Sequence, residues 1–156
     1  GITVETDYDA VTSDVPFYGV YYGQSALPLP ADKLIYLTNE TLQNCRVYDF
    51  ETGDYIAVYD TDMLTGKDPY QAFLSGSKSL LTIENPAATN DRELILFRDS
   101  FGSSIAPLLA SGYAKITLVD IRYVSPNMLG RFLDFTGKDV LFLYSTSVLN
   151  SSETMK

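Results

Sequence analysis

Three apolar runs of strand length, separated by two helix-like segments, constrain the fold of this chain more than any other feature. The runs cover residues 93–97, 114–119 and 139–144. Continuous apolar runs joined through helices are typical of parallel strands that are buried on both faces. The short links favour right-handed crossovers. The sequence therefore predicts three neighbouring parallel strands whose carboxyl ends meet at one edge of a sheet.

The two helix-like segments differ in how clearly they are marked. In the first, Ile105, Leu108 and Leu109 recur at helical spacing and Gly112 can end the helix. Pro107 requires that this helix either starts late, near Ser103, or is kinked. In the second, Ser125 and Pro126 form a cap and first-turn pair, and Gly137 ends the segment.

In the first half of the chain, the sequence predicts shorter strands and helices. Residues 1–16 are polar and acidic and predict an extended lead-in, so we place one domain over residues 17–156. Further strands are expected at 33–37 and 80–83, and a strand or hairpin arm at 17–22. Residues 46–50 and 55–59 predict a hairpin. A helical turn is expected at 60–64, and a short helix capped by Asp68 at 68–74.

Composition excludes several classes of function. The net charge of −9 would repel nucleic acid and anionic membrane surfaces. The single cysteine, Cys45, cannot form an internal disulfide, and with no histidine present we expect neither a zinc site nor another cofactor.

No apolar stretch is long enough for a membrane span, and the start at Gly1, without methionine, suggests that a targeting segment or an upstream domain has been removed.

Polar side chains follow each of the three predicted strands. Candidate site residues are Arg98, Asp99 and Ser100 after the first strand, Asp120, Arg122 and Tyr123 after the second, and Ser145 and Ser147 after the third. In an open parallel sheet, sites form beyond the carboxyl ends of the strands. This edge is therefore the candidate site.

Ser100 is the candidate nucleophile, but a serine hydroxyl needs a base to take its proton, and the usual base is histidine. The chain contains no histidine. Spacing alone favours the alternative that Ser100 or Asp99 simply caps the following helix. It likewise favours a structural ion pair for Asp120 and Arg122 over a role in a site.

Two sequence blocks resemble the C-terminal part of the DHHW family. They are Asp-Ser-Phe-Gly at 99–102, within 97–109, and Asp-Ile-Arg-Tyr at 120–123, within 116–123; residues 139–144, 17–22 and 67–76 also resemble family segments. DHHW proteins are bacterial, envelope-associated relatives of SGNH hydrolases and of SGNH-like alginate O-acetyltransferases. The resemblance implies a three-layer α/β/α sandwich, SGNH- or flavodoxin-like, with a mostly parallel sheet and an additional β-hairpin region.

The resemblance also implies a function and shows where this chain departs from the family pattern. Ser100 matches the nucleophile position of carbohydrate O-acyl esterases and acetyltransferases. In related enzymes the base comes from an upstream Asp-x-His element, whereas this chain has neither histidine nor tryptophan, and Arg98 stands where many SGNH enzymes have glycine. The chain is thus expected to be the C-terminal portion of a longer protein, inactive by itself, with the upstream part of the same protein as a partner.

An alternative is a degenerate member that binds without catalysing, a glycan- or protein-binding module that uses its 12 tyrosines. In either case the resemblance implies an extracellular or cell-envelope location and a cell-envelope polysaccharide as partner.

Overall fold

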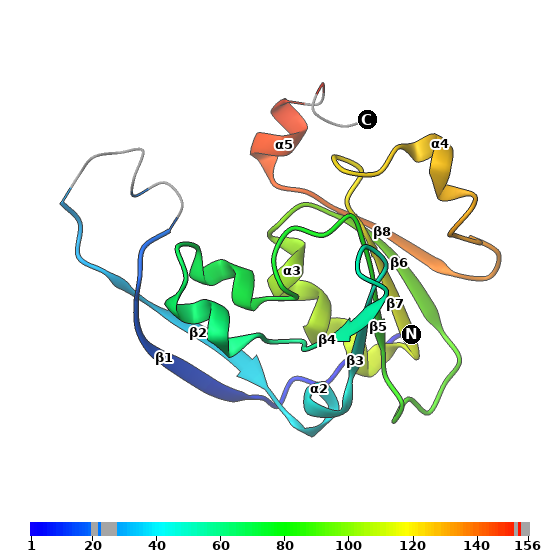
Figure 1. Ribbon diagram of the computed structural model, residues 1–156. Helices are drawn as coiled ribbons and strands as arrows, with labels where there is room; N and C mark the ends of the chain where they lie inside the picture. The colour runs from blue at the N-terminus through cyan, green and yellow to red at the C-terminus, as the bar shows by residue number, and fades with distance from the viewer. Residues whose placement is uncertain (20–21, 23–27, 152, 154–156) are drawn as a thin grey trace.

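The computed structural model describes residues 1–19, 22, 28–151 and 153, which form a mixed α/β fold with two sheets (Figure 1). The larger sheet has six strands in the order β4-β3-β5-β7-β6-β8, and the smaller one pairs β1 with β2. The strands are β1 (Asp9–Phe17), β2 (Asp32–Thr38), β3 (Arg46–Asp49), β4 (Asp54–Ile56), β5 (Leu80–Glu84), β6 (Glu93–Arg98), β7 (Lys115–Val119) and β8 (Asp139–Leu143). The α-helices are α2 (Glu40–Asn44), α3 (Gly102–Ile105), α4 (Pro126–Leu129) and α5 (Thr146–Asn150), and the 3₁₀ helices are η1 (Thr61–Thr65), η2 (Pro69–Ala72) and η3 (Ala106–Gly112).

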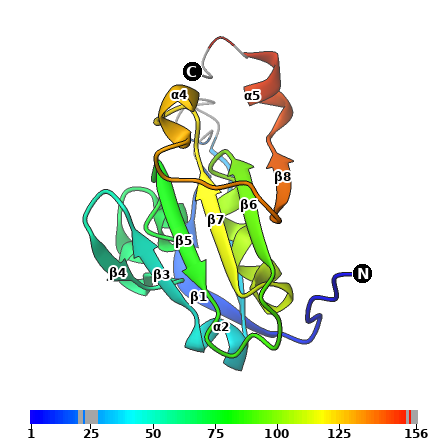
Figure 2. The same cartoon turned by 90° about the vertical axis from the view of Figure 1, so that its right-hand side faces the viewer.

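The three apolar runs form neighbouring parallel strands, as the sequence predicted. β6 lies in the middle and pairs in parallel with β7 on one side and with β8 on the other (Figure 2). Phe97 is opposite Val119, and Arg98 is opposite Leu143. The carboxyl ends of all three strands therefore lie at one edge of the sheet.

The sheet as a whole is mixed, so the expectation of a mostly parallel sheet was wrong. β5 pairs antiparallel with β7, β3 pairs antiparallel with β5, and β4 pairs antiparallel with β3. β3 and β4 are joined by a tight turn with Gly53 at φ +78°, which forces opposite directions. β5 is an apolar run buried on both faces, and such a run carries no information about its direction.

The first predicted helix ends at Gly112, as expected, whereas the second is shorter than its apolar pattern suggested. The helix after β6 changes from α to 3₁₀ geometry at Ala106, immediately before Pro107, so the proline marks a change of helix type. α4 ends at Leu129, well before Gly137, which has φ +70°. η2 begins as expected, with the Asp68 side chain accepting from the Tyr70 N–H. Helix α2, capped by Asn39, was not predicted.

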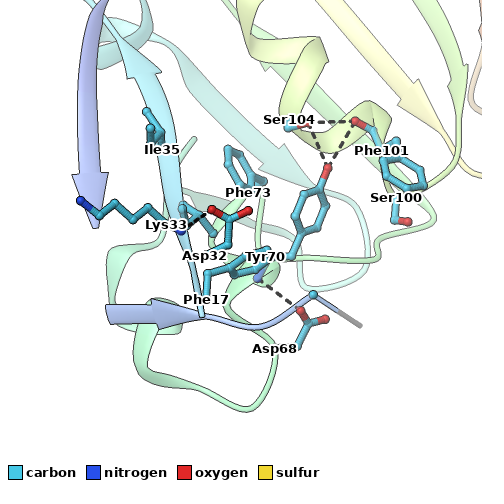
Figure 3. Close-up of a pocket in the computed structure, with 12 residues that line it drawn as sticks. Phe17, Asp32, Lys33, Ile35, Asp68, Tyr70, Phe73, Ser100, Phe101 and Ser104 are labelled. Carbon is cyan, nitrogen blue, oxygen red and sulfur yellow. Dashed lines mark hydrogen bonds between the residues drawn. The ribbon is translucent and has the colours of Figure 1, made fainter. Parts of the chain in front are cut away.

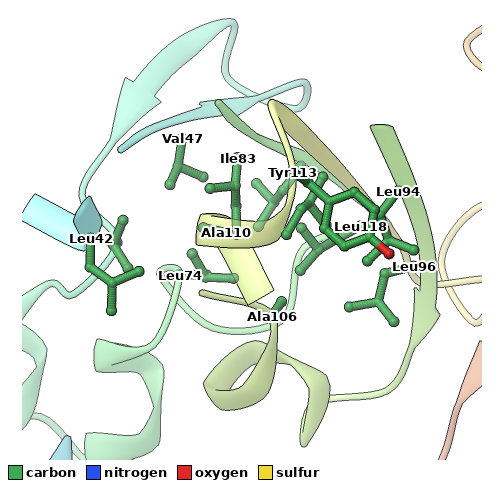
Figure 4. Packing of buried hydrophobic residues seen from close by; sticks show 13 residues of the cluster. Leu42, Val47, Leu74, Ile83, Leu94, Leu96, Ala106, Ala110, Tyr113 and Leu118 are labelled. Carbon is green, nitrogen blue, oxygen red and sulfur yellow. The ribbon is translucent and has the colours of Figure 1, made fainter. Parts of the chain in front are cut away.

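Two apolar clusters lie on opposite faces of the six-stranded sheet. On one face, Leu94 and Leu96 of β6 pack with Ala106 and Ala110 of η3 (Figure 4). On the other face, Ile95, Phe97 and Val119 pack with Leu129 of α4. This alternation follows from the pleat of β6, which sends successive side chains to opposite faces.

The β1–β2 sheet stands apart from the six-stranded sheet and packs on η1 and η2 through a third cluster around Leu34 and Phe73 (Figure 1). β1 covers residues 9–17, so it takes up the second half of the stretch 1–16 predicted as an extended lead-in and ends one residue beyond it. Of the arm expected at 17–22, residues 20 and 21 lie outside the described residues. Within the described residues, no helix combines the length and the apolar character that a membrane crossing needs.

Candidate functional site

The turn after β6 is held by the buried carboxylate of Asp99. Its Oδ1 accepts from the Phe101 N–H at 3.0 Å and closes the turn around Ser100. Its Oδ2 accepts from the Ser145 N–H at 2.7 Å and ties the end of β6 to the residue that follows β8 by two positions. Asp99 is 1% exposed, so these bonds form away from water and position the turn firmly.

Ser100 lies in this turn, half-buried, at the wall of a pocket (Figure 3). Its carbonyl oxygen accepts from the Ser103 N–H at 3.1 Å. Among the described residues, the Ser100 Oγ has no hydrogen-bond partner. The serine that the sequence singled out thus lines a cavity, and its hydroxyl makes no hydrogen bond to the part of the chain that the structure describes.

The pocket lies between the Ser100 turn, η2 and the β1–β2 sheet, and has a volume of about 510 Å³. Its walls combine aromatic rings with two carboxylates and one lysine: Phe17, Tyr70, Phe73 and Phe101, with Asp32, Asp68 and Lys33. The Tyr70 hydroxyl lies 3.0 Å from the Ser104 Oγ and 3.4 Å from the Phe101 carbonyl oxygen, so it joins η2 to α3. Burial raises the pKa of Tyr70, so at neutral pH it is a hydrogen-bond donor.

Asp120 and Arg122 form the ion pair that the sequence favoured. The buried Asp120 carboxylate accepts from Arg122 Nε at 2.9 Å and from Arg122 Nη2 at 2.6 Å. Arg98 Nη1 lies 3.7 Å from the same carboxylate, and the Arg98 side chain is fully buried. Burial lowers the pKa of Arg98, and the neighbouring Asp120 opposes that shift.

The remaining candidates occupy the same edge with structural contacts of their own. Ser145 caps α5 by accepting from the Val148 N–H at 3.4 Å. Tyr123 is exposed, and the Arg122 guanidinium lies 5.4 Å from its ring centroid. Tyr144, the last residue of the predicted strand 139–144 and not one of the candidate site residues, has a buried Oη without a partner among the described residues. Burial, with Asp120 and Asp99 nearby, raises the pKa of Tyr144 to about 12.

The structure brings the predicted residues to one edge but does not join them into a catalytic set. No hydrogen bond links the Ser100 side chain to Asp99 or Asp120 within the described residues, and both carboxylates are engaged by other donors. Nor do the described residues contain a cluster of three acidic or cysteine side chains that could hold a metal ion. The sequence did not indicate the pocket residues Tyr70 and Ser104. Ser104 lies one helical turn after Ser100, and this spacing is the one signal that could have pointed to Ser104; Tyr70 has no such signal.

Comparisons with known proteins support the DHHW resemblance at the level of fold. No family model and no curated protein matches the chain. The crystal structure of a DHHW family protein from Eubacterium siraeum is 20% identical and has a TM-score of 0.66; the match covers 98% of this chain and 54% of that one. Two structures of Bacillus cereus PatB1, one with a sulfonyl adduct, are 21% identical with TM-scores of 0.65 and 0.64; the matches cover 92% of this chain and 50% and 48% of those chains. The chain thus spans about half the length of the solved proteins it resembles, and it shares the fold of a DHHW family protein over almost its whole length.

Proposed function

We propose that this chain is the C-terminal part of an SGNH-like protein of the bacterial cell envelope that acts on O-acyl groups of carbohydrate, with Ser100 as the nucleophile. One observation carries the proposal: Ser100 lines a pocket at the carboxyl end of the central strand β6, and its hydroxyl has no hydrogen-bond partner among the described residues. β7 and β8 lie on opposite sides of β6, so the serine is at the switch point where ligands bind in open α/β sheets. In this proposal the sheet and the helices on its two faces form a three-layer α/β/α sandwich.

In the proposed reaction the Ser100 Oγ attacks the acyl carbonyl carbon. The Oγ–C bond forms, the ester C–O bond breaks, and the sugar oxygen leaves with a proton. A base must take the Ser100 proton first. Asp99 accepts from two backbone N–H groups and Asp120 from Arg122, so neither is free to do so. The pocket carboxylates Asp32 and Asp68 accept from the Lys33 and Tyr70 N–H groups, and neither is hydrogen-bonded to the Ser100 hydroxyl within the described residues. We therefore assign the base to a part of the protein outside residues 1–156, and Asp99 to holding the turn.

The pocket supports a carbohydrate as substrate. Phe17, Tyr70, Phe73 and Phe101 offer flat apolar surfaces, while Ser104 and Tyr70 offer hydroxyls. The two carboxylates of Asp32 and Asp68 outnumber the one ammonium of Lys33 in this cavity, and the chain carries a net charge of −9. Negative walls repel uronic acids, so the proposed substrate is a neutral or amino sugar of an envelope polysaccharide.

The second candidate is a non-catalytic module that binds glycan or a partner protein at the cell envelope. The aromatic pocket favours it, because rings of this kind hold sugars or protein side chains without any chemistry. It differs from the first candidate in needing no base.

Initial rates on p-nitrophenyl acetate separate the two candidates. We expect residues 1–156 to be no faster than the Ser100→Ala variant, because general-base assistance, worth about 10²–10⁴-fold, is missing. The longer protein encoded by the gene should be faster than background, and Ser100→Ala should abolish the difference. The control is Ser77→Ala, which removes the hydroxyl of an exposed serine that does not line the pocket. Equal rates for the longer protein and its Ser100→Ala variant would favour the binding module.

A sulfonyl fluoride gives a second readout that does not require turnover. Since PatB1 carries a sulfonyl adduct in one of its structures, phenylmethylsulfonyl fluoride should add to an activated Ser100. Intact-mass spectrometry should show one adduct on the longer protein, none on Ser100→Ala and none on residues 1–156.

A further inference from the structure

Strand β8 lies at the edge of the six-stranded sheet but has the composition of an interior strand. Its residues Val140, Leu141 and Phe142 are 44%, 39% and 64% exposed. Continuous apolar runs belong to strands that have neighbours on both sides. Exposed edge strands usually carry lysine, proline or a bulge, which block pairing with another strand. Within β8 none of these protections is present.

The exposed apolar surface continues on both faces of β8. On one face, Phe142 stacks on the buried Phe97 with ring centroids 4.7 Å apart. Phe135, 43% exposed, stacks on Phe97 as well, at 6.4 Å. On the other face, Leu141 is opposite Leu96 of the core. We call Phe135, Val140, Leu141 and Phe142 the β8 patch; each is at least 39% exposed. Contiguous surfaces of this kind are usually covered.

We propose that a β-strand from the part of the protein that precedes Gly1 pairs with the free edge of β8 and covers the β8 patch. The proposal rests on one element of the proposed function, that residues 1–156 are the C-terminal part of a longer protein. The solved proteins of similar fold match 92–98% of this chain with only about half of their own length. In each of them a comparable amount of chain remains outside the match.

The position of the N-terminus favours a preceding segment as the occupant. Figure 2 shows the N-terminus on the β8 side of the sheet. Ile2 packs closely on Gly112, and the next residue, Tyr113, interacts with Asp139, the first residue of β8. A segment that continued upstream from Gly1 would thus emerge near the amino end of β8.

A second copy of the chain is a poorer occupant. Each copy carries a net charge of −9, so two copies repel each other. An upstream strand, by contrast, is held close by its own connection to Gly1 and needs no second molecule.

Hydrogen exchange tests the pairing directly. The comparison is between residues 1–156 and the longer protein encoded by the gene, both in solution at low concentration. Amides of residues 140–143 that point away from β6 should exchange at least about tenfold more slowly in the longer protein, because a new strand would accept from them. Amides of β7, which is interior in both proteins, should exchange equally.

A substitution provides an independent measurement of the same contact. Phe142→Lys should lower the thermal midpoint by at least about 5 °C more in the longer protein than in residues 1–156, where the ring is largely exposed and loses only its stacking on Phe97. Tyr55→Lys, on the opposite edge strand β4 and 51% exposed, should shift both proteins equally.

Unprotected β8 amides in the longer protein, or equal shifts for Phe142→Lys in both, would overturn the proposal. Protection of β8 in residues 1–156 that increases with protein concentration would also overturn it, in favour of a second copy. Neither readout uses Ser100, so a covered β8 in a protein that Ser100 reagents do not label would reject the hydrolase function and keep this inference.

Discussion

At the scale of single residues, two neighbours after β6 have opposite environments. The Asp99 carboxylate is buried and accepts two backbone N–H groups, whereas the Ser100 hydroxyl has no partner within the described part of the chain. The sequence left open whether Asp99 or Ser100 caps the following helix. In the structure the Asp99 carboxylate accepts the hydrogen bond that closes the turn, so the Ser100 side chain is not needed for this role and lines the pocket instead.

The bonds of Asp99 predict a clear effect of its removal. Asp99→Ala should destabilise the fold by about 2–3 kcal/mol, because the Phe101 and Ser145 N–H groups lose a charged acceptor in a partly buried place. Chemical denaturation monitored by circular dichroism measures the change. Asp91→Ala, at an exposed aspartate, should stay within about 0.5 kcal/mol of the parent. A loss for Asp99→Ala no larger than that of Asp91→Ala would show that the turn does not depend on this carboxylate.

At the scale of elements, the contact between β6 and α3 depends on the absence of a side chain. A Cβ at Gly102 would lie 2.5 Å from the Arg98 Cβ, and Arg98 is fully buried under this position. The Arg98 stem fills the space beside Gly102, and its guanidinium reaches toward Asp120 at the end of β7. Gly102 thus lets the helix start close to β6, the strand that precedes the Ser100 turn.

We expect Gly102→Ala to destabilise the protein by about 1–3 kcal/mol, since the overlap involves the Arg98 Cβ, which cannot move without the backbone. Gly130→Ala is the matched control: it has open space around it and follows α4 with φ −61°. It should be neutral or stabilising by up to about 1 kcal/mol. Urea unfolding of both variants compares them, and a Gly102→Ala variant as stable as Gly130→Ala would contradict the close packing.

The elements also show how far sequence reasoning reaches. The strands β6, β7 and β8 and their common edge follow from apolar runs and helix spacers, which are local signals. The direction of β5 was not predictable, because an apolar run buried on both faces reads the same in either direction. The pocket was not predictable either, since Tyr70 meets Ser104 across 34 residues of sequence. Only tertiary packing brings η2 to the Ser100 turn.

At the scale of the whole molecule, the pKa shifts of paired carboxylates predict how stability depends on acid. Burial by itself would raise the pKa of Asp49. The Lys78 ammonium at 2.9 Å and backbone N–H groups lower this pKa by more than burial raises it, so the net shift is downward. The Ser79 N–H lowers the pKa of Glu51, and Lys138 lowers that of Glu93. These groups bind fewer protons in the folded than in the unfolded chain. Their contribution to stability is present above the unfolded values of about 4 and is lost as the pH falls through the folded values.

The dependence of the thermal midpoint on pH in the acid range, called the acid limb below, therefore tests these ion pairs. The thermal midpoint should decrease steadily from about pH 5 to pH 2, where these carboxylates take up protons. Thermal unfolding followed by circular dichroism across this range measures it, and Glu93→Gln should make the decrease less steep while lowering the midpoint at pH 7. A midpoint that stays constant between pH 5 and 2 would mean that these contacts contribute nothing to folding.

At alkaline pH we expect a second loss of stability, caused by half-buried groups that are protonated in the folded chain. Burial, together with Glu5, raises the pKa of Cys45 to about 11, and burial raises the pKa of Tyr59 and Tyr144 to about 12. A group whose pKa is higher in the folded chain favours folding below its unfolded value, and this contribution is lost as the pH rises through the folded value. We expect the thermal midpoint to be highest between about pH 5 and 8 and to fall above about pH 9, first through Cys45 and then through the tyrosines. Cys45→Ala should reduce the fall between about pH 9 and 11 and leave the acid limb unchanged, because alanine has no proton to lose. An alkaline limb identical in the parent and in Cys45→Ala would assign it to the tyrosines alone.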